Sequence, residues 1–150
     1  MVNRISEADF ERPTDIWTYR ARPDQDSTHE LGVVDGDTYE LVVDLGFRTM
    51  AGIRVRAMHI NTAETHGVSR ESDEYQIGIQ QTQFVREWID DTIEYAQSAE
   101  DVPREWPLLI RTERQTGKYG RWLAELFDWR GKSLETAIIN EFGDDYISDG

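Results

Sequence analysis

Cysteine is absent from this chain of 150 residues, and lysine, proline and long apolar runs are scarce. Without cysteine there is no disulfide framework, no thiolate metal site and no thiol nucleophile, so the fold depends on a packed core. No stretch approaches the roughly 18 apolar residues of a membrane-spanning helix. Residues 1–12 also lack the apolar centre of a secretion signal. These absences predict a cytoplasmic protein, or one carried by a virus, without a membrane partner.

The charge of the chain is strongly negative. It has 30 acidic and 16 basic residues, a net charge of -14, and only Lys118 and Lys132 are lysines. Nucleic-acid binding normally needs a net basic face. Either the partner is not nucleic acid, or the protein works in high salt, where the Debye length falls to about 3 Å at 1 M. We favour high salt, because an acid-rich, lysine-poor composition resembles that of proteins from halophilic archaea and their viruses.

The length fits one domain over residues 1–150, with a loose arm at 1–13 and a frayed acidic tail at 144–150. Alternating apolar and polar residues predict strands before residue 61 and on both sides of a turn at 116–120. Gly46 and Gly52 are expected at bends or bulges. The predicted extended segments are 15–21, 31–34, 38–45, 53–60, 106–112 and 121–129.

Two helices are predicted after the first group of strands. From Gln80 the apolar residues recur at helical spacing, and the acids at 87, 90, 91 and 94 face water. Residues 61–73 are predicted to form a mobile surface loop. A short second helix has Ser133 as its N-cap and Gly143 after its last turn. The predicted order of elements is strands, a helix, strands and a second helix. This order indicates a mainly β, α+β fold, namely a five-stranded Greek-key barrel of the OB type with two helices.

Three short motifs contain the side chains that phosphodiester hydrolysis requires. That reaction needs a hard cation held by oxygen ligands, a group that activates water, and cationic groups on the phosphate oxygens. Arginine suits the last role because its planar guanidinium grips two oxygens at once. The motifs are Asp35-Gly36-Asp37-Thr38, Arg56 with Asn61-Thr62-Ala63-Glu64, and Lys118-Tyr119-Gly120-Arg121.

In order and separation, these motifs resemble those of the staphylococcal-nuclease (thermonuclease) family over roughly residues 31 to 142. The resemblance implies an OB barrel that cleaves DNA or RNA with Ca²⁺, and a monomer is expected. It also implies a role for each matched position. Asp37, Asn61 and Thr62 are the metal ligands, Arg56, Glu64 and Arg121 are catalytic, Lys118 and Tyr119 bind substrate, and Asp35 supports the site.

The chain departs from the family pattern at two positions. Asn61 replaces the second metal carboxylate, which predicts weak Ca²⁺ binding because cation affinity follows ligand charge. Ala63 replaces a proline that stiffens the turn. Two alternatives to a nuclease therefore stay open: an OB module without catalysis that binds single-stranded nucleic acid or protein, and a viral accessory protein in which the barrel is only a scaffold.

Two geometric expectations complete the sequence analysis. Arg56 and Asn61 differ by an odd number of positions, so an unbroken strand would place them on opposite faces. The chain must therefore bend after Ile60 if both belong to one site. His59 is interpreted as a half-buried strand residue and His66 as a loop residue, and neither is assigned to the site.

Overall fold

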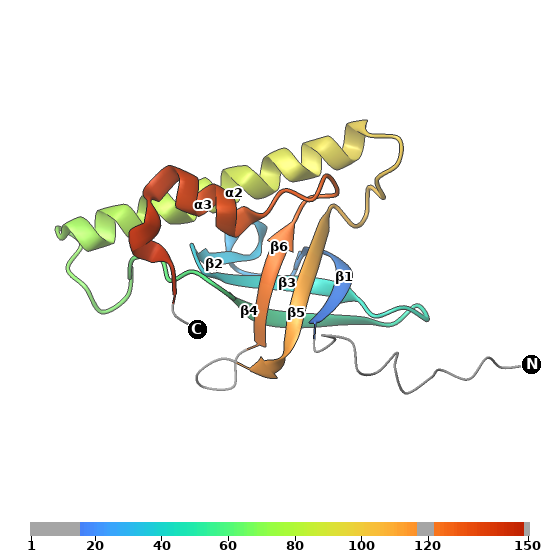
Figure 1. The fold of residues 1–150 in the computed structure, drawn as a ribbon, viewed down its shortest axis with the longest axis horizontal. Helices are drawn as coiled ribbons and strands as arrows, with labels where there is room; N and C mark the ends of the chain where they lie inside the picture. The colour runs from blue at the N-terminus through green and yellow to red at the C-terminus, as the bar shows by residue number, and fades with distance from the viewer. Residues whose placement is uncertain (1–15, 117–121, 149–150) are drawn as a thin grey trace, which may run out of the picture.

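The computed structural model describes residues 16–116 and 122–148 of the chain (Figure 1). It is a mixed α+β protein with a six-stranded sheet and two α-helices. The strands are β1 (Ile16–Pro23), β2 (Val33–Asp35), β3 (Thr38–Asp44), β4 (Met50–Ala57), β5 (Leu108–Thr116) and β6 (Trp122–Phe127). The helices are α2 (Asp73–Ser98) and α3 (Leu134–Phe142), with 3-10 turns η1 (Glu30–Gly32) and η3 (Asp144–Tyr146). None of the helices in the described ranges is long and apolar enough to cross a membrane.

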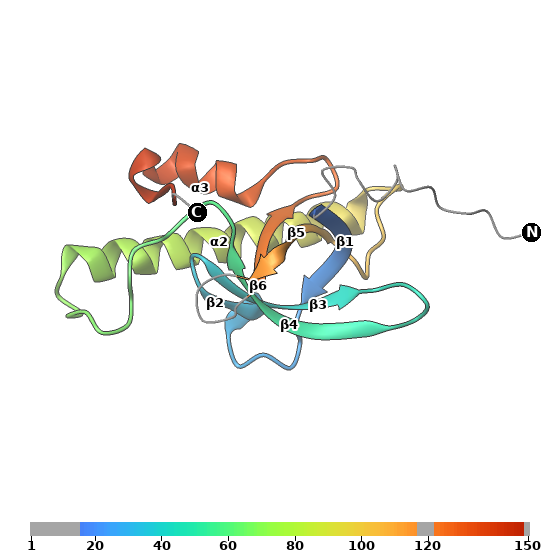
Figure 2. The ribbon, with the colours of Figure 1, turned by 60° about the horizontal axis from the view of Figure 1, so that its bottom comes forward.

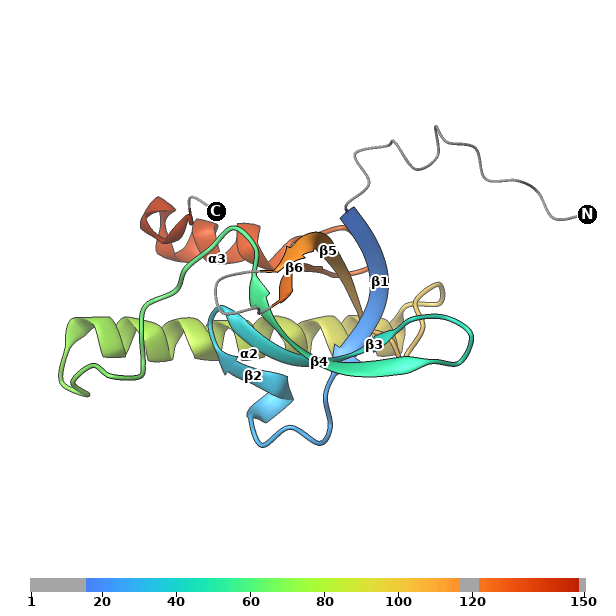
Figure 3. The same ribbon diagram turned by 90° about the horizontal axis from the view of Figure 1, so that it is seen from below.

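The strand order in the sheet is β1-β5-β6-β4-β3-β2, and β1 also pairs with β3. All of these pairings are antiparallel except that of β4 with β6, which is parallel. Both helices lie on one side of the strands in Figure 1, and Figure 3 shows the strands in front of α2 when the molecule is seen from below. The pairing of β4 with β6 places two strands side by side that are far apart in the sequence.

Burial along β3 confirms the alternation of apolar and polar residues that was expected there. Tyr39, Leu41 and Val43 on one face of β3 are at most 2% exposed. The helices add Val85, Ile89, Leu134 and Ile138, all fully buried in the same cluster. Burying an aliphatic side chain of this size contributes about 1.5–3 kcal/mol, so the packed core can hold the fold without disulfides.

The helix ends follow the expected capping chemistry, but α2 begins earlier than predicted. The hydroxyl of Ser133 accepts a hydrogen bond from the amide of Thr136, and Gly143 has φ 95° after the last turn of α3, as expected. α2 begins at Asp73 rather than Gln80, because Ser72 caps it by accepting a bond from the amide of Tyr75. Its first two turns are mostly polar, which hid them from the apolar pattern.

Several local expectations are wrong in ways that affect the site. β4 ends at Ala57, so the chain bends at residues 58–59 and not after Ile60. Gly52 lies in a regular part of the β3–β4 ladder, opposite Val42, and forms no bulge. Part of the segment expected to be extended over 31–34 is instead the turn η1, in which Leu31 and Gly32 have positive φ.

The acidic tail is ordered through residue 148, contrary to the prediction of fraying. Ile147 forms a β-bridge with Ile60. The amide of Asn61 donates to the carbonyl of Tyr146 over 2.8 Å, and the amide of Ser148 donates to the carbonyl of His59 over 2.7 Å. Figure 2 shows the red end of the chain beside the segment that leaves β4. The tail therefore supports residues 59–61 from one side.

Candidate functional site

The turn between β2 and β3 presents two carboxylates at one end of the sheet. The amide of Asp37 donates to Oδ1 of Asp35 over 3.1 Å, and the buried hydroxyl of Tyr39 donates to the carbonyl of Gly36 over 2.7 Å. The register of β2 with β3 shifts between Val33 and Asp35, as at a bulge. These contacts fix the turn, and Asp37 is only 6% exposed.

Asp37 contacts residues from the second motif. Its Oδ2 accepts a hydrogen bond from the amide of Thr62 over 3.0 Å, and Nη2 of Arg56 lies 3.7 Å from the same oxygen. The carbonyl of Asp37 also accepts from the amide of Ala57 over 2.8 Å. The structure thus brings together Asp35, Asp37, Arg56 and Thr62, four of the positions to which the resemblance gives a role.

The turn and the loop are in close contact. A Cβ on Gly36 would lie 2.7 Å from Cγ2 and 2.9 Å from Oγ1 of Thr62. Such distances are below van der Waals contact, so only glycine lets the turn approach Thr62 in this way. The glycine between the two acids is therefore needed for packing as well as for the turn.

The loop after β4 is held against α2, which corrects the prediction of a mobile surface loop for its first residues. The amide of Ala63 donates to Oε1 of Gln81 over 2.8 Å, and Gln81 is fully buried. A Cβ on Gly78 would lie 2.7 Å from the carbonyl of Ala63. Thr62 is buried as well, at 8% exposed. The sequence analysis missed Gln81 because a glutamine on a helix is usually solvent-facing.

The side chains of Asn61 and Glu64 belong to exposed residues of this loop. Within residues 16–116 and 122–148, no hydrogen bond or ion pair joins the Glu64 carboxylate to another side chain or to the backbone. Glu64 is exposed to water. Asn61 is placed next to Thr62, whose amide binds Asp37.

The two acids of the turn share a partly buried environment. Burial is the main reason why the pKa of Asp35 is raised from 3.8 to about 6. A hydrogen bond with the Asp37 side chain and the negative charge of Asp37 also raise it, whereas the hydrogen bond from the Asp37 amide lowers it. Two carboxylates this close disfavour double ionisation. Asp35 therefore takes up a proton near pH 6.

The third motif lies outside the described residues. Lys118, Tyr119 and Arg121 fall in the range 117–121, so the roles that the resemblance implies for them stay predictions. Trp122, the first residue described after that range, pairs in register with Val55, and Leu123 pairs with Arg56.

The chain matches no protein-family model, no curated protein and no solved structure. Its site must therefore be interpreted from its own residues. The side-chain contacts of the Asp37 carboxylate are the Thr62 amide, the Thr38 hydroxyl and the Arg56 guanidinium. Asp37 has about four lone-pair positions, and its hydrogen bonds from Thr38 and Thr62 use one on each oxygen. Arg56 supplies positive charge beside the same carboxylate.

A second group of potential metal ligands lies elsewhere. In the part of the chain that the structure describes, one group of three or more histidine, aspartate or glutamate residues has its ligand atoms within 4.8 Å of one another: His59, Glu125 and Glu135. Asp37 does not belong to it. His59 is more exposed than predicted, with 55% of its side chain accessible, because β4 ends two residues before it.

Proposed function

We propose that this protein is a metal-dependent nuclease that hydrolyses phosphodiester bonds of DNA or RNA, with the five-stranded barrel and site of the staphylococcal-nuclease type. The observation that carries the proposal is the contact between motifs. The buried Asp37 carboxylate accepts the Thr62 amide at 3.0 Å and lies 3.7 Å from the Arg56 guanidinium. Arg56 and Thr62, which follow Asp37 by 19 and 25 positions in the chain, thus form one polar cluster with it at the end of the sheet.

The strand pairings support the barrel part of the proposal. β1 pairs with β5 on one side and with β3 on the other, and β5–β6, β6–β4 and β4–β3 complete the circuit. A ring of five strands, antiparallel except for the parallel β4–β6 pair and interrupted by a helix, fits a small Greek-key barrel of the OB type. The helix between β4 and β5 is α2, which also anchors the loop that carries Glu64.

Each residue has a role in the proposed reaction. Asp37, the Asn61 amide and the Thr62 carbonyl would hold Ca²⁺, which when bound supplies positive charge for the phosphate. Arg56 grips non-bridging phosphate oxygens with its guanidinium fork. Glu64, exposed and unpaired among the described residues, orients the attacking water and accepts its proton.

The remaining assignments come from the third motif. Arg121 is proposed to stabilise the charge that develops on the phosphate, while Lys118 and Tyr119 bind the nucleic acid, with Tyr119 stacking on a base. Asp35 supports the turn by accepting the amide of Asp37. The net charge of -14 repels a nucleic acid, which is also negatively charged. We therefore propose that the protein acts at high salt, where this long-range repulsion is screened.

Digestion of single- and double-stranded DNA and RNA tests the proposal. The full chain is assayed in molar KCl with Ca²⁺, Mg²⁺ or Mn²⁺ and with EDTA, beside Asp37→Asn. The proposal predicts cleavage that needs a divalent cation and is lost in Asp37→Asn, while Asp91→Asn on the exposed face of α2 cleaves as the parent does. Binding of nucleic acid without cleavage under any metal would favour the OB module without catalysis.

A further inference from the structure

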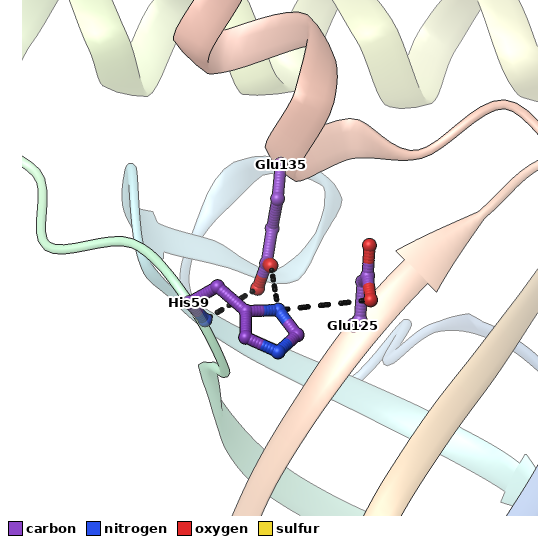
Figure 4. A group of neighbouring side chains, drawn as sticks. All are labelled: His59, Glu125 and Glu135. Carbon is purple, nitrogen blue, oxygen red and sulfur yellow. Dashed lines mark hydrogen bonds and ion pairs between the residues drawn. The ribbon is translucent and has the colours of Figure 1, made fainter. Parts of the chain in front are cut away.

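His59, Glu125 and Glu135 meet from three separate segments on the side of the sheet that faces α3. His59 follows β4, Glu125 lies in β6, and Glu135 is the second residue of α3. Nδ1 of His59 lies 2.8 Å from Oε2 of Glu135 and 3.7 Å from Oε1 of Glu125. Figure 4 shows both carboxylates directed at the same edge of the imidazole ring. One imidazole nitrogen and two carboxylate oxygens therefore converge on one point.

The remaining oxygen of each carboxylate is held by another group. Oε1 of Glu135 accepts hydrogen bonds from the amides of Met58 at 2.6 Å and His59 at 3.2 Å. Oε2 of Glu125 accepts from the hydroxyl of Ser133 over 2.7 Å. Hydrogen bonds of this kind orient the ligands of metal sites and are part of their affinity. Here they leave one oxygen of each glutamate aimed at Nδ1.

The cluster holds two largely buried carboxylates and one imidazole. Glu135 is 4% exposed, and 14% of the Glu125 side chain is accessible. Arg111 pairs in register with Glu125, but its guanidinium lies over the ring of Phe127, 5.2 Å from the centroid. A single imidazolium can balance only one of the two carboxylates. Leaving buried negative charge uncompensated is costly.

We propose that His59 Nδ1, Glu125 Oε1 and Glu135 Oε2 form a binding site for a divalent transition metal, Zn²⁺ in particular. Zinc binds imidazole nitrogen and carboxylate oxygen at about 2.0–2.2 Å in tetrahedral geometry, so its ligand atoms stand about 3.3–3.5 Å apart. The observed 2.8 and 3.7 Å reach those values through shifts of less than about 1 Å. The imidazole ligand favours Zn²⁺ over Ca²⁺ or Mg²⁺.

The site has three protein ligands and one side open to water, since 55% of the His59 side chain is exposed. Three ligands with an accessible fourth position are typical of zinc sites that bind a water or a small anion. The metal would join the end of β4, β6 and the start of α3. It is independent of the Asp37 cluster and shares no ligand with it.

Calorimetric titration with ZnCl₂ tests the proposal on the full chain, purified without a histidine tag and freed of metal with EDTA. The parent should bind one Zn²⁺. His59→Gln and Glu125→Gln should weaken binding at least about 10–100-fold, the loss caused by removing even an outer hydrogen-bond partner of a metal ligand. His66→Gln, in an exposed loop, and Asp37→Asn are the matched controls and should bind Zn²⁺ as the parent does.

A second measurement does not depend on any variant folding. X-ray absorption at the zinc edge of the parent should show one imidazole and oxygen ligands in the first shell. Thermal melts of the metal-free variants identify any that fail to fold, and only folded variants enter the comparison. Absence of Zn²⁺ binding up to millimolar metal overturns the proposal. Zn²⁺ binding that survives in His59→Gln, or that is lost in Asp37→Asn, also overturns it. The cluster is then a group without metal, in which a proton on His59 joins the imidazole to the carboxylates.

Discussion

Asp35→Asn is expected to change how the stability of this protein depends on pH. In the folded protein the pKa of Asp35 is raised from 3.8 to about 6, chiefly by burial and then by the side-chain hydrogen bond and the charge of Asp37. The folded state therefore binds the Asp35 proton more tightly than the unfolded state. Stability falls as pH rises from about 4 to above 6, because the unfolded chain ionises this carboxyl first.

The magnitude follows from the same two values. A difference from 3.8 to about 6 corresponds to about 3 kcal/mol, and partial access to solvent reduces the expected cost at neutral pH to about 1–2 kcal/mol. Asparagine cannot ionise, and its Oδ1 still accepts the amide of Asp37, so the variant avoids the cost and keeps the turn. Asp35→Asn should thus be more stable than the parent at neutral pH and equal to it near about pH 4.

Urea unfolding at fixed KCl concentration, repeated between about pH 4 and about pH 8, measures this difference. Glu135 also has a raised pKa, but it is present in both proteins and cancels in the comparison. Asp91→Asn, at an exposed position of α2, serves as control and should track the parent at every pH. A gap between Asp35→Asn and the parent that does not change with pH would refute the reasoning.

Gln81→Ala is expected to lower the free energy of unfolding by about 1–3 kcal/mol, because it leaves the amide of Ala63 unpaired. It should also slow cleavage by loosening the loop, whereas the exposed Gln80→Ala should stay within about 0.5 kcal/mol of the parent. The melting temperature should rise with KCl as the Debye length falls from ~10 Å at 0.1 M to ~3 Å at 1 M, and a flat or falling curve contradicts the halophile interpretation. Asn61→Asp should tighten Ca²⁺ binding in calorimetry, because it restores a ligand charge; an unchanged affinity would mean that Asn61 does not face the metal.

The sequence was sufficient to predict the features that depend on local pattern. Alternation along β3 identified its buried face, and Ser133 with Gly143 marked both ends of α3. The acids at 87, 90, 91 and 94 are exposed on α2, as their spacing indicated. The nearness of Asp37 to Arg56 follows from the strand register, because Thr38, the next residue after Asp37, pairs with Arg56 across β3 and β4.

Features that depend on tertiary contacts could not be predicted. From the sequence, Gln81 would be interpreted as a surface residue of a helix. In the structure the backbone of Ala63 lies against α2, where its amide donates to Gln81 and its carbonyl lies close to Gly78. The tail is rich in acids, yet its backbone bonds to residues 59–61 order it. His59 and Glu135 are 76 positions apart, and nothing in either local sequence indicates that they meet.

Cleavage rates of four variants test the proposed nuclease site most directly. Arg56→Ala is compared with Arg54→Ala, two residues away on the same strand and paired with Glu40. Glu64→Gln is compared with Glu71→Gln in the same exposed segment. The account predicts losses of about 10²–10³-fold in rate for Arg56→Ala and Glu64→Gln, the usual effect of removing one group from a preorganised site. Both controls should cleave as the parent does. If Arg56→Ala and Glu64→Gln fold and cleave like the parent, the cluster at Asp37 is not an active site.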